Sequence, residues 1–121
     1  MNSQVATVLV VEDNATLRSL ILEILGPADY TLLEAPDGES ALQIAAKHPE
    51  IDLVITDGRM PGMSGPRLAR HIIDTRPQVK SLLISGDSDA RSLRGQSLPL
   101  LLKPFTPEEL RAAVHRLLRP T

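Results

Sequence analysis

Apolar residues along this chain fall into short runs that are separated by stretches with helical spacing. The runs are typical of strands buried in a parallel sheet and cover residues 5–11, 30–35, 52–56, 80–85 and 98–102. Between them, apolar positions three or four residues apart predict helices over 14–25, 39–47, 64–75 and from 106 to about 119. Strands that alternate with helices through short connections predict one parallel sheet, with right-handed crossovers and helices on both faces.

Capping residues mark several of the predicted helix ends. Ser64 precedes one helix, and Thr106, Pro107 and Glu109 have the spacing of a capping box with a proline in the first turn. The apolar stripes expected to face the sheet comprise Leu17, Leu20, Ile21, Ile24 and Leu25 in the first helix, and Leu110, Val114, Leu117 and Leu118 in the last.

The segment 86–97, between the fourth and fifth strands, breaks this regularity. A fourth helix belongs there, but Ala90 and Leu93 are nearly all the apolar material that the segment contains. Such a helix has little to pack against the sheet. We therefore expect a shortened or irregular fourth helix, or a mobile loop.

The composition narrows the classes of function. The 13 Lys and Arg residues against 15 Asp and Glu residues give a formal net charge of −2, so no basic excess points to direct binding of nucleic acid. The absence of Cys excludes disulfides, thiolate metal sites and Cys nucleophiles. No apolar run approaches the roughly 20 residues of a membrane span, and the N-terminus lacks a signal-peptide pattern. For these 121 residues we expect one domain over 1–121, cytoplasmic and without membrane insertion.

Polar side chains follow four of the predicted strands. Glu12 and Asp13 follow the first strand, Asp57 the third, Ser85 the fourth and Lys103 the fifth. The carboxyl ends of parallel strands share one edge of the sheet, where ligands bind. Clustered carboxylates repel one another unless a cation lies between them, and Mg²⁺ prefers such oxygen ligands. Acids, a hydroxyl and one Lys without a positioned His indicate phosphoryl chemistry.

Each of these residues also has a structural interpretation. Glu12 and Asp13 favour a helix N-terminus by their charge alone. Asp57 or Ser85 alone is an ordinary polar residue at the end of a strand, and Lys103 alone is a solvated surface residue. Only their combination, in this order and each at a strand end, indicates a functional site.

Taken together, the motifs resemble the receiver domain of bacterial two-component signalling over essentially the whole chain. The residues that carry the resemblance are the acidic pair in the sequence VVEDN at 10–14, the segment DGRMPGMSG at 57–65, Ser85, and Lys103-Pro104-Phe105. The resemblance implies a flavodoxin-like, doubly wound α/β fold whose five parallel strands have the order 2-1-3-4-5.

The resemblance also implies a metal-dependent phosphoacceptor. Asp57 would be the nucleophile that takes a phosphoryl group from a phosphohistidine on a histidine kinase or a histidine phosphotransfer protein. Glu12, Asp13, Asp57 and the backbone carbonyl of Arg59 would hold Mg²⁺ or Mn²⁺. Such a domain is no enzyme in the usual sense: it phosphorylates itself, hydrolyses the product slowly and switches its binding to a downstream protein, which the sequence does not name.

Other residues are expected around the phosphoryl group. Ser85, Lys103 and Gly58 would bind its oxygens, and the Lys103–Pro104 peptide bond would be cis, which only an X-Pro bond makes cheap.

Two departures from the family pattern bear on output. Receivers commonly carry a Tyr or Phe three residues before the conserved Lys, where this chain has Leu100. With the fourth helix also curtailed, we expect output through the 86–97 segment. Many shortened receivers are attached to hybrid sensor kinases or act alone as relay shuttles. A further hypothesis is that Arg59 and Asp87 face each other and form an ion pair that gates the site, although exposed pairs contribute only about 0–1 kcal/mol.

Two other functions compete with the phosphoacceptor. One is a phosphorylation-independent interaction module on the same fold, which is disfavoured because none of the acidic or Lys positions is missing. The other is a phosphatase of the haloacid-dehalogenase type, whose nucleophile and second Asp follow the first strand two residues apart. Glu12-Asp13-Asn14 does not fit that pattern.

Overall fold

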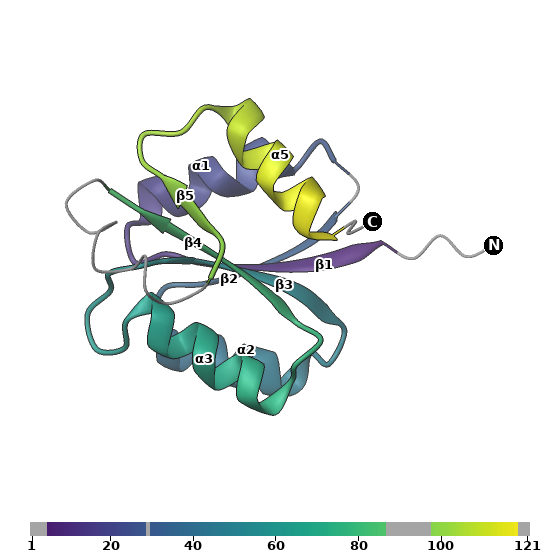
Figure 1. Cartoon of the computed structure of the whole chain (residues 1–121), viewed down its shortest axis with the longest axis vertical. Helices are drawn as coiled ribbons and strands as arrows, with labels where there is room; N and C mark the ends of the chain where they lie inside the picture. The colour runs from purple at the N-terminus through teal and green to yellow at the C-terminus, as the bar shows by residue number, and fades with distance from the viewer. Residues whose placement is uncertain (1–4, 29, 87–97, 119–121) are drawn as a thin grey trace.

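The computed structural model of the chain describes residues 5–28, 30–86 and 98–118. Within these ranges five strands and four helices follow the predicted alternation (Figure 1). The strands are β1 (Ala6–Val11), β2 (Tyr30–Ala35), β3 (Ile51–Asp57), β4 (Lys80–Ser85) and β5 (Leu100–Leu102). The helices are α1 (Ala15–Leu25), α2 (Gly38–Lys47), α3 (Gly65–Thr75) and α5 (Pro107–Leu118).

The five strands form one parallel sheet in the order β2-β1-β3-β4-β5. This is the flavodoxin-like arrangement that the resemblance implies, so the predicted fold class is confirmed. The chain runs outward from β1 to β2 and then crosses to β3 on the other side of β1. The strand order therefore reverses between β1 and β3, and open α/β sheets bind their ligands beside such a reversal.

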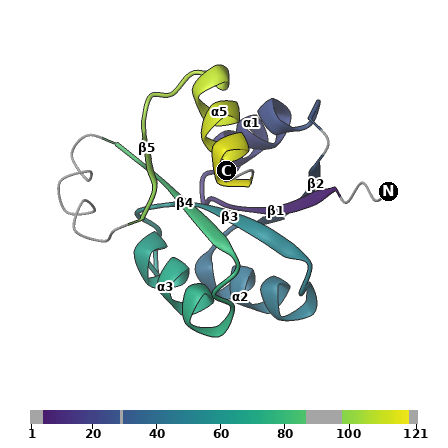
Figure 2. The ribbon, with the colours of Figure 1, turned by 45° about the vertical axis from the view of Figure 1, so that its right-hand side comes forward.

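Helices cover both faces of the sheet (Figures 1 and 2): α1 and α5 lie on one face, and α2 and α3 on the other. Alternate residues of each central strand supply the two cores. Val8 and Val10 of β1 belong to the core beneath α1 and α5, whereas Leu9 and Val11 belong to the core beneath α2 and α3. Burial on both faces explains why the strands read as continuous apolar runs.

The predicted caps are confirmed. The Ser64 hydroxyl accepts a hydrogen bond from the Arg67 amide at the start of α3. Thr106 and Glu109 form a reciprocal capping box: the Glu109 amide donates to the Thr106 hydroxyl at 3.1 Å, and the Thr106 amide donates to the Glu109 carboxylate at 2.8 Å.

Three sequence predictions need correction. Strand β5 begins at Leu100 rather than at residue 98, because Pro99 has no N–H to donate to the ladder and contributes only its carbonyl, which accepts from the Leu83 amide. Leu20 lies on the outer side of α1 with 45% of its surface exposed. Leu117 and Leu118, predicted to be buried, are only partly buried, because they pack against the edge of the core beneath α1 and α5 and also line a surface hollow. The predicted short fourth helix falls on 87–97, outside the described residues.

Candidate functional site

The carboxyl ends of β3, β4 and β5 are joined by main-chain hydrogen bonds that continue past the strands. The Gly58 amide donates to the Ile84 carbonyl at 2.8 Å, and the Lys103 amide donates to the Ser85 carbonyl at 2.7 Å. These two bonds place the residues that follow the strands side by side. Asp57, Ser85 and Lys103 are therefore neighbours at one edge, as the sequence predicted.

Glu12 and Asp13 of the β1–α1 turn join Asp57 at this edge. One carboxylate oxygen of each of the three residues lies within 4.8 Å of the others. Glu12 and Asp57 are buried, and Asp13 is exposed. The like charges of such a cluster repel one another unless a cation balances them.

Asp57 is held at both of its carboxylate oxygens. Oδ2 accepts a hydrogen bond from the Lys103 ammonium at 3.0 Å, and Oδ1 accepts one from the Arg59 amide at 3.1 Å. The Asp57 side chain is 11% exposed and that of Lys103 is 32% exposed. The Lys103–Pro104 peptide bond is cis, as the resemblance implied. Asp57 thus combines a fixed orientation with a narrow opening to solvent.

Glu12 has one satisfied and one unsatisfied oxygen. Oε2 accepts a hydrogen bond from the Asn14 amide at 3.0 Å, whereas Oε1 is buried without a partner among the described residues. Burial raises the pKa of Glu12 to about 8; the Asn14 amide opposes this rise and the Asp57 carboxylate adds to it. A buried carboxylate oxygen without a donor is a suitable ligand for a hard cation, so the acidic cluster fits Mg²⁺ or Mn²⁺.

The other predicted phosphate ligands lie at the same edge. The buried Ser85 hydroxyl donates to the Gly86 carbonyl at 3.3 Å. The Gly58 amide is engaged with β4, as described above, and its role in phosphate binding stays a prediction. Arg59 is exposed and follows Asp57 by two residues. Asp87, its predicted partner in a gate, lies outside the described residues.

The loop from Gly58 to Gly65 is closed at its base. The Gly65 amide donates to the Gly58 carbonyl at 3.1 Å. Gly65 lies so close to the Asp57 main chain that a Cβ atom on it would collide with the Asp57 carbonyl oxygen. Gly62, near the tip of the loop, has a φ of 86°, which favours glycine. Helix α3 therefore begins directly against the backbone of the predicted nucleophile.

Two residues near this edge were not predicted from the sequence: Arg18, which contacts Glu12, and Glu34, which contacts Arg18. The Arg18 guanidinium donates to the main-chain oxygen of Glu12 at 2.7 Å and to the Glu34 carboxylate at 2.9 Å. Two signals were available. Arg18 follows the helix cap Asn14 by four residues and so lies one turn above it, and Glu34 is the only charged residue in the apolar run that precedes Ala35.

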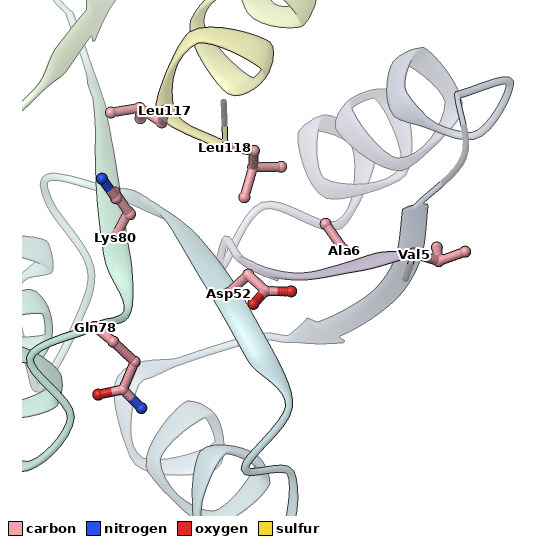
Figure 3. Close-up of a pocket in the computed structure, with 7 residues that line it drawn as sticks. All are labelled: Val5, Ala6, Asp52, Gln78, Lys80, Leu117 and Leu118. Atoms are coloured by element: carbon pink, nitrogen blue, oxygen red, sulfur yellow. The ribbon is translucent and has the colours of Figure 1, made fainter. Parts of the chain in front are cut away.

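A hollow of about 320 Å³ lies at the opposite, amino-terminal edge of the sheet (Figure 3). Its lining consists of Val5, Ala6, Asp52, Gln78, Lys80, Leu117 and Leu118. Asp52 belongs to β3, as Asp57 does, but its carboxylate accepts a hydrogen bond from the Thr7 amide at 2.9 Å. This carboxylate therefore completes the hydrogen bonding of the sheet.

Within the described ranges, none of the helices combines the length and the apolar character needed to cross a membrane.

Comparison with known proteins links this geometry to a family. The family model described as response regulator receiver domain matches residues 8–115. Sensor kinase CckA of Brucella abortus (strain 2308) is 37% identical over 118 residues, which cover 93% of this chain. Aerobic respiration control protein ArcA of Escherichia coli (strain K12) is 31% identical over 121 residues, which cover 98% of this chain. The chain spans only 12% of the length of the first relative and 50% of the second.

The fold has a similar counterpart among solved structures. A response regulator receiver domain protein from Clostridium thermocellum superposes with a TM-score of 0.86 at 27% identity, and the match covers 94% of each chain. The likeness therefore extends over nearly the whole of both domains.

Proposed function

This chain belongs to the response regulator receiver domain family of two-component signalling, and we propose that within it Asp57 accepts a phosphoryl group from a phosphohistidine. The observation that carries the proposal is the surroundings of Asp57. Its carboxylate lies 3.0 Å from the Lys103 ammonium and within 4.8 Å of Glu12 and Asp13. A carboxylate that only stabilised the fold would gain nothing from two further acids beside it.

The transfer exchanges one bond to phosphorus for another. A carboxylate oxygen of Asp57 forms a P–O bond while the P–N bond of the phosphohistidine breaks and leaves its electron pair on the imidazole nitrogen. The product is an acyl phosphate. In the later hydrolysis of this acyl phosphate, a water oxygen attacks phosphorus and the P–O bond to Asp57 breaks. Inorganic phosphate leaves, and the Asp57 carboxylate is restored. The Lys103 ammonium neutralises charge on the phosphoryl oxygens in both steps.

Glu12, Asp13, Asp57 and the Arg59 carbonyl are the groups that would hold Mg²⁺ or Mn²⁺. When bound, such an ion offsets the negative charge that the carboxylates and the phosphoryl group share. The buried Oε1 of Glu12, which has no partner in the part of the chain that the structure describes, supports this assignment. Lys103 and the Arg59 amide fix the orientation of the Asp57 carboxylate, and its low exposure limits access of bulk water.

The proposed partners follow from the reaction. A phosphohistidine donor is either a histidine kinase or a histidine phosphotransfer protein, and the phosphorylated domain would then act on a downstream protein. Sensor kinase CckA, as its name states, is a kinase, and it is eight times or so longer than the matched region. We propose that the present domain acts in such a relay, either inside a hybrid kinase or alone.

The experiment that tests the function is phosphorylation by a small donor. The protein is incubated with acetyl phosphate and Mg²⁺, and its intact mass is measured. We expect a single labile phosphoryl adduct, which a chelator prevents and which is absent from Asp57→Asn. Asp52→Asn is the matched control, because the same change on the same strand leaves the acidic cluster intact and should leave the adduct in place.

The competing functions give different results in the same assay. A folded parent protein that forms no adduct with acetyl phosphate or with a phosphorylated histidine kinase would favour the interaction module. Release of many phosphates per protein in steady state would favour the phosphatase.

A further inference from the structure

We infer that Arg18 is a positioning residue that, together with Glu34, holds Glu12 in place for the cation, an inference that rests on the proposed function. Neither residue belongs to the acidic cluster. Arg18 lies on α1 and Glu34 on β2, so the pair connects two elements to the end of a third.

The first step concerns what fixes Glu12. Its amide donates to the Ala35 carbonyl at 3.1 Å, and its carboxylate Oε2 accepts from the Asn14 amide at 3.0 Å. Its main-chain oxygen is held by the Arg18 guanidinium at 2.7 Å. Three of the polar groups of Glu12 are thus occupied, and the fourth, Oε1, is buried without a partner among the described residues. The Glu12 carboxylate also belongs to the acidic cluster with Asp57.

The second step concerns the charge of Arg18. A cation next to three acids would ordinarily bind one of them and compete with a metal ion. The Arg18 guanidinium instead forms an ion pair with Glu34 at 2.9 Å, and within the described part of the chain its other hydrogen bond goes to a main-chain oxygen. Its side chain is 19% exposed. Glu34 therefore neutralises Arg18 and turns it away from the carboxylates that are left for the cation.

The third step concerns position. Glu34 is paired with Val10 in the register of β1 and β2, two residues before Glu12. The salt bridge consequently anchors the Arg18 side chain over the end of β1, where it reaches the Glu12 carbonyl. Groups that orient the ligands of a metal typically change its affinity by about 10- to 100-fold when they are removed.

The test measures Mn²⁺ affinity of the unphosphorylated protein, from the electron paramagnetic resonance of the free ion. We expect Arg18→Met to weaken binding about tenfold and Arg18→Lys, which keeps the charge, to recover part of the loss. The matched control is Arg76→Met. Arg76 also donates two hydrogen bonds to main-chain oxygens, those of Ala45 and His48, but on the face of α2 and α3. The Arg76→Met variant should be less stable than the parent protein but should bind Mn²⁺ with unchanged affinity.

A second readout needs no metal. The Asn14 amide is held by the Glu12 carboxylate, so its hydrogen exchange in the metal-free protein reports how firmly Glu12 is placed. Arg18→Met should speed this exchange, and Arg76→Met should not. If Arg18→Met does not fold, Glu34→Gln replaces it, with Glu50→Gln as its control, because Glu50 also forms an exposed ion pair but with His48.

The possible results separate the inference from the proposed function. A parent protein that binds Mn²⁺, with unchanged affinity and unchanged Asn14 exchange in folded Arg18→Met, overturns the positioning role and leaves the phosphoacceptor intact. A folded parent protein that binds no divalent cation overturns both. Weakened binding in Arg18→Met but not in Arg76→Met supports both.

Discussion

Strand β3 carries an aspartate near each end, and the two differ in burial and in the groups that surround their carboxylates. Asp52, at the amino end, is exposed and its carboxylate accepts a hydrogen bond from the Thr7 amide. Asp57, at the carboxyl end, is buried beside two further acids and an ammonium group. The register between β1 and β3 shifts between Thr7 and Val8. The Thr7 amide at this irregularity donates to the Asp52 side chain. The Asp52 carboxylate completes the hydrogen bonding of the sheet, whereas the Asp57 carboxylate lies in the acidic cluster that we propose as the phosphoacceptor site.

A lysine accompanies each of these aspartates, which makes the comparison closer. Lys80 of β4 lies next to Leu53 in the register and lines the same hollow as Asp52. In Figure 3 its side chain extends toward Leu117, while the Asp52 carboxylate points toward β1. At the other edge, Lys103 reaches Asp57 directly. Side chains at the same end of neighbouring strands therefore need not converge: Lys103 contacts the Asp57 carboxylate, whereas the Asp52 carboxylate accepts from the Thr7 amide.

The largest expected effect is that of Lys103→Met, with Lys80→Met as its matched control. Lys103→Met removes the cation that offsets charge on the phosphoryl group, and loss of one such donor typically slows a reaction by about 100-fold or more. Lys80→Met should leave the rate unchanged. The measurement is the initial rate of adduct formation with acetyl phosphate. Equal rates in the two variants would contradict the assigned role of Lys103.

The second prediction concerns pH and the metal-free protein. The folded state raises the pKa of Glu12 from 4.5 to about 8, so folding favours the protonated form. The contribution of Glu12 protonation to the stability of the folded state is fully present below pH 4.5 and is lost as the pH rises to about 8. The free energy of unfolding of the parent protein should therefore fall by an amount on the order of 1–3 kcal/mol between pH 5 and 8. Glu12→Gln, which cannot lose this proton, should lack that decline. Urea unfolding in chelator, compared with the same series on Asp52→Asn, measures it; identical slopes in parent and Glu12→Gln would argue against a buried, protonated Glu12.

The third prediction uses the contact between α3 and the nucleophile. Gly65→Ala places a methyl group against the Asp57 carbonyl oxygen, and overpacking of this kind typically costs about 1–3 kcal/mol. It should also slow phosphorylation, because relief of the collision moves the Asp57 backbone. Gly26→Ala is the control at a site with more room and no link to Asp57. Chemical unfolding and the acetyl phosphate assay provide the two measurements, and a Gly65→Ala protein with parental rates would show that the contact does not set the Asp57 position.

The smallest expected effect is at the amino end of β3. Asp52→Ala removes the acceptor of the Thr7 amide, a hydrogen bond whose loss typically costs about 0.5–1.5 kcal/mol. The phosphorylation rate should not change. Urea unfolding combined with the adduct assay tests both halves of this statement. A slower rate in Asp52→Ala would mean that the two ends of the strand are coupled.

Much of this organisation was predictable from the sequence because local and global signals agree. The apolar runs gave the sheet, the motifs at the strand ends identified the family, and both predictions are confirmed. The caps Ser64 and Thr106 could be predicted from the sequence, because each depends on residues three positions apart. The exposure of Leu20 was not predicted, because its apolar character and its spacing in the sequence did not reveal that it lies on the outer side of α1.

The contacts of Arg18 illustrate the remaining limit. The spacing of Arg18 from Asn14 and the lone charge of Glu34 in its apolar run mark these two residues. They do not reveal that Arg18 contacts both Glu34 and the Glu12 main-chain oxygen, which come from two other elements. Likewise, whether Glu12 Oε1 finds a donor depends on how side chains pack around it, and within residues 5–28, 30–86 and 98–118 it finds none. Spacing predicts which residues share an edge; it does not predict which atoms there remain unsatisfied.

The bond between Gly58 and Gly65 makes the loop between them a ring with a narrow neck. The tip of that ring, around Gly62, is exposed, and the ring also contains Arg59, whose amide donates to the Asp57 carboxylate at 3.1 Å. A contact made at the tip is therefore connected to the Asp57 side chain through the short main-chain segment from Arg59 to Gly62. If Asp57 accepts a phosphoryl group as proposed, a partner that binds the ring would touch the same segment that orients the acceptor carboxylate.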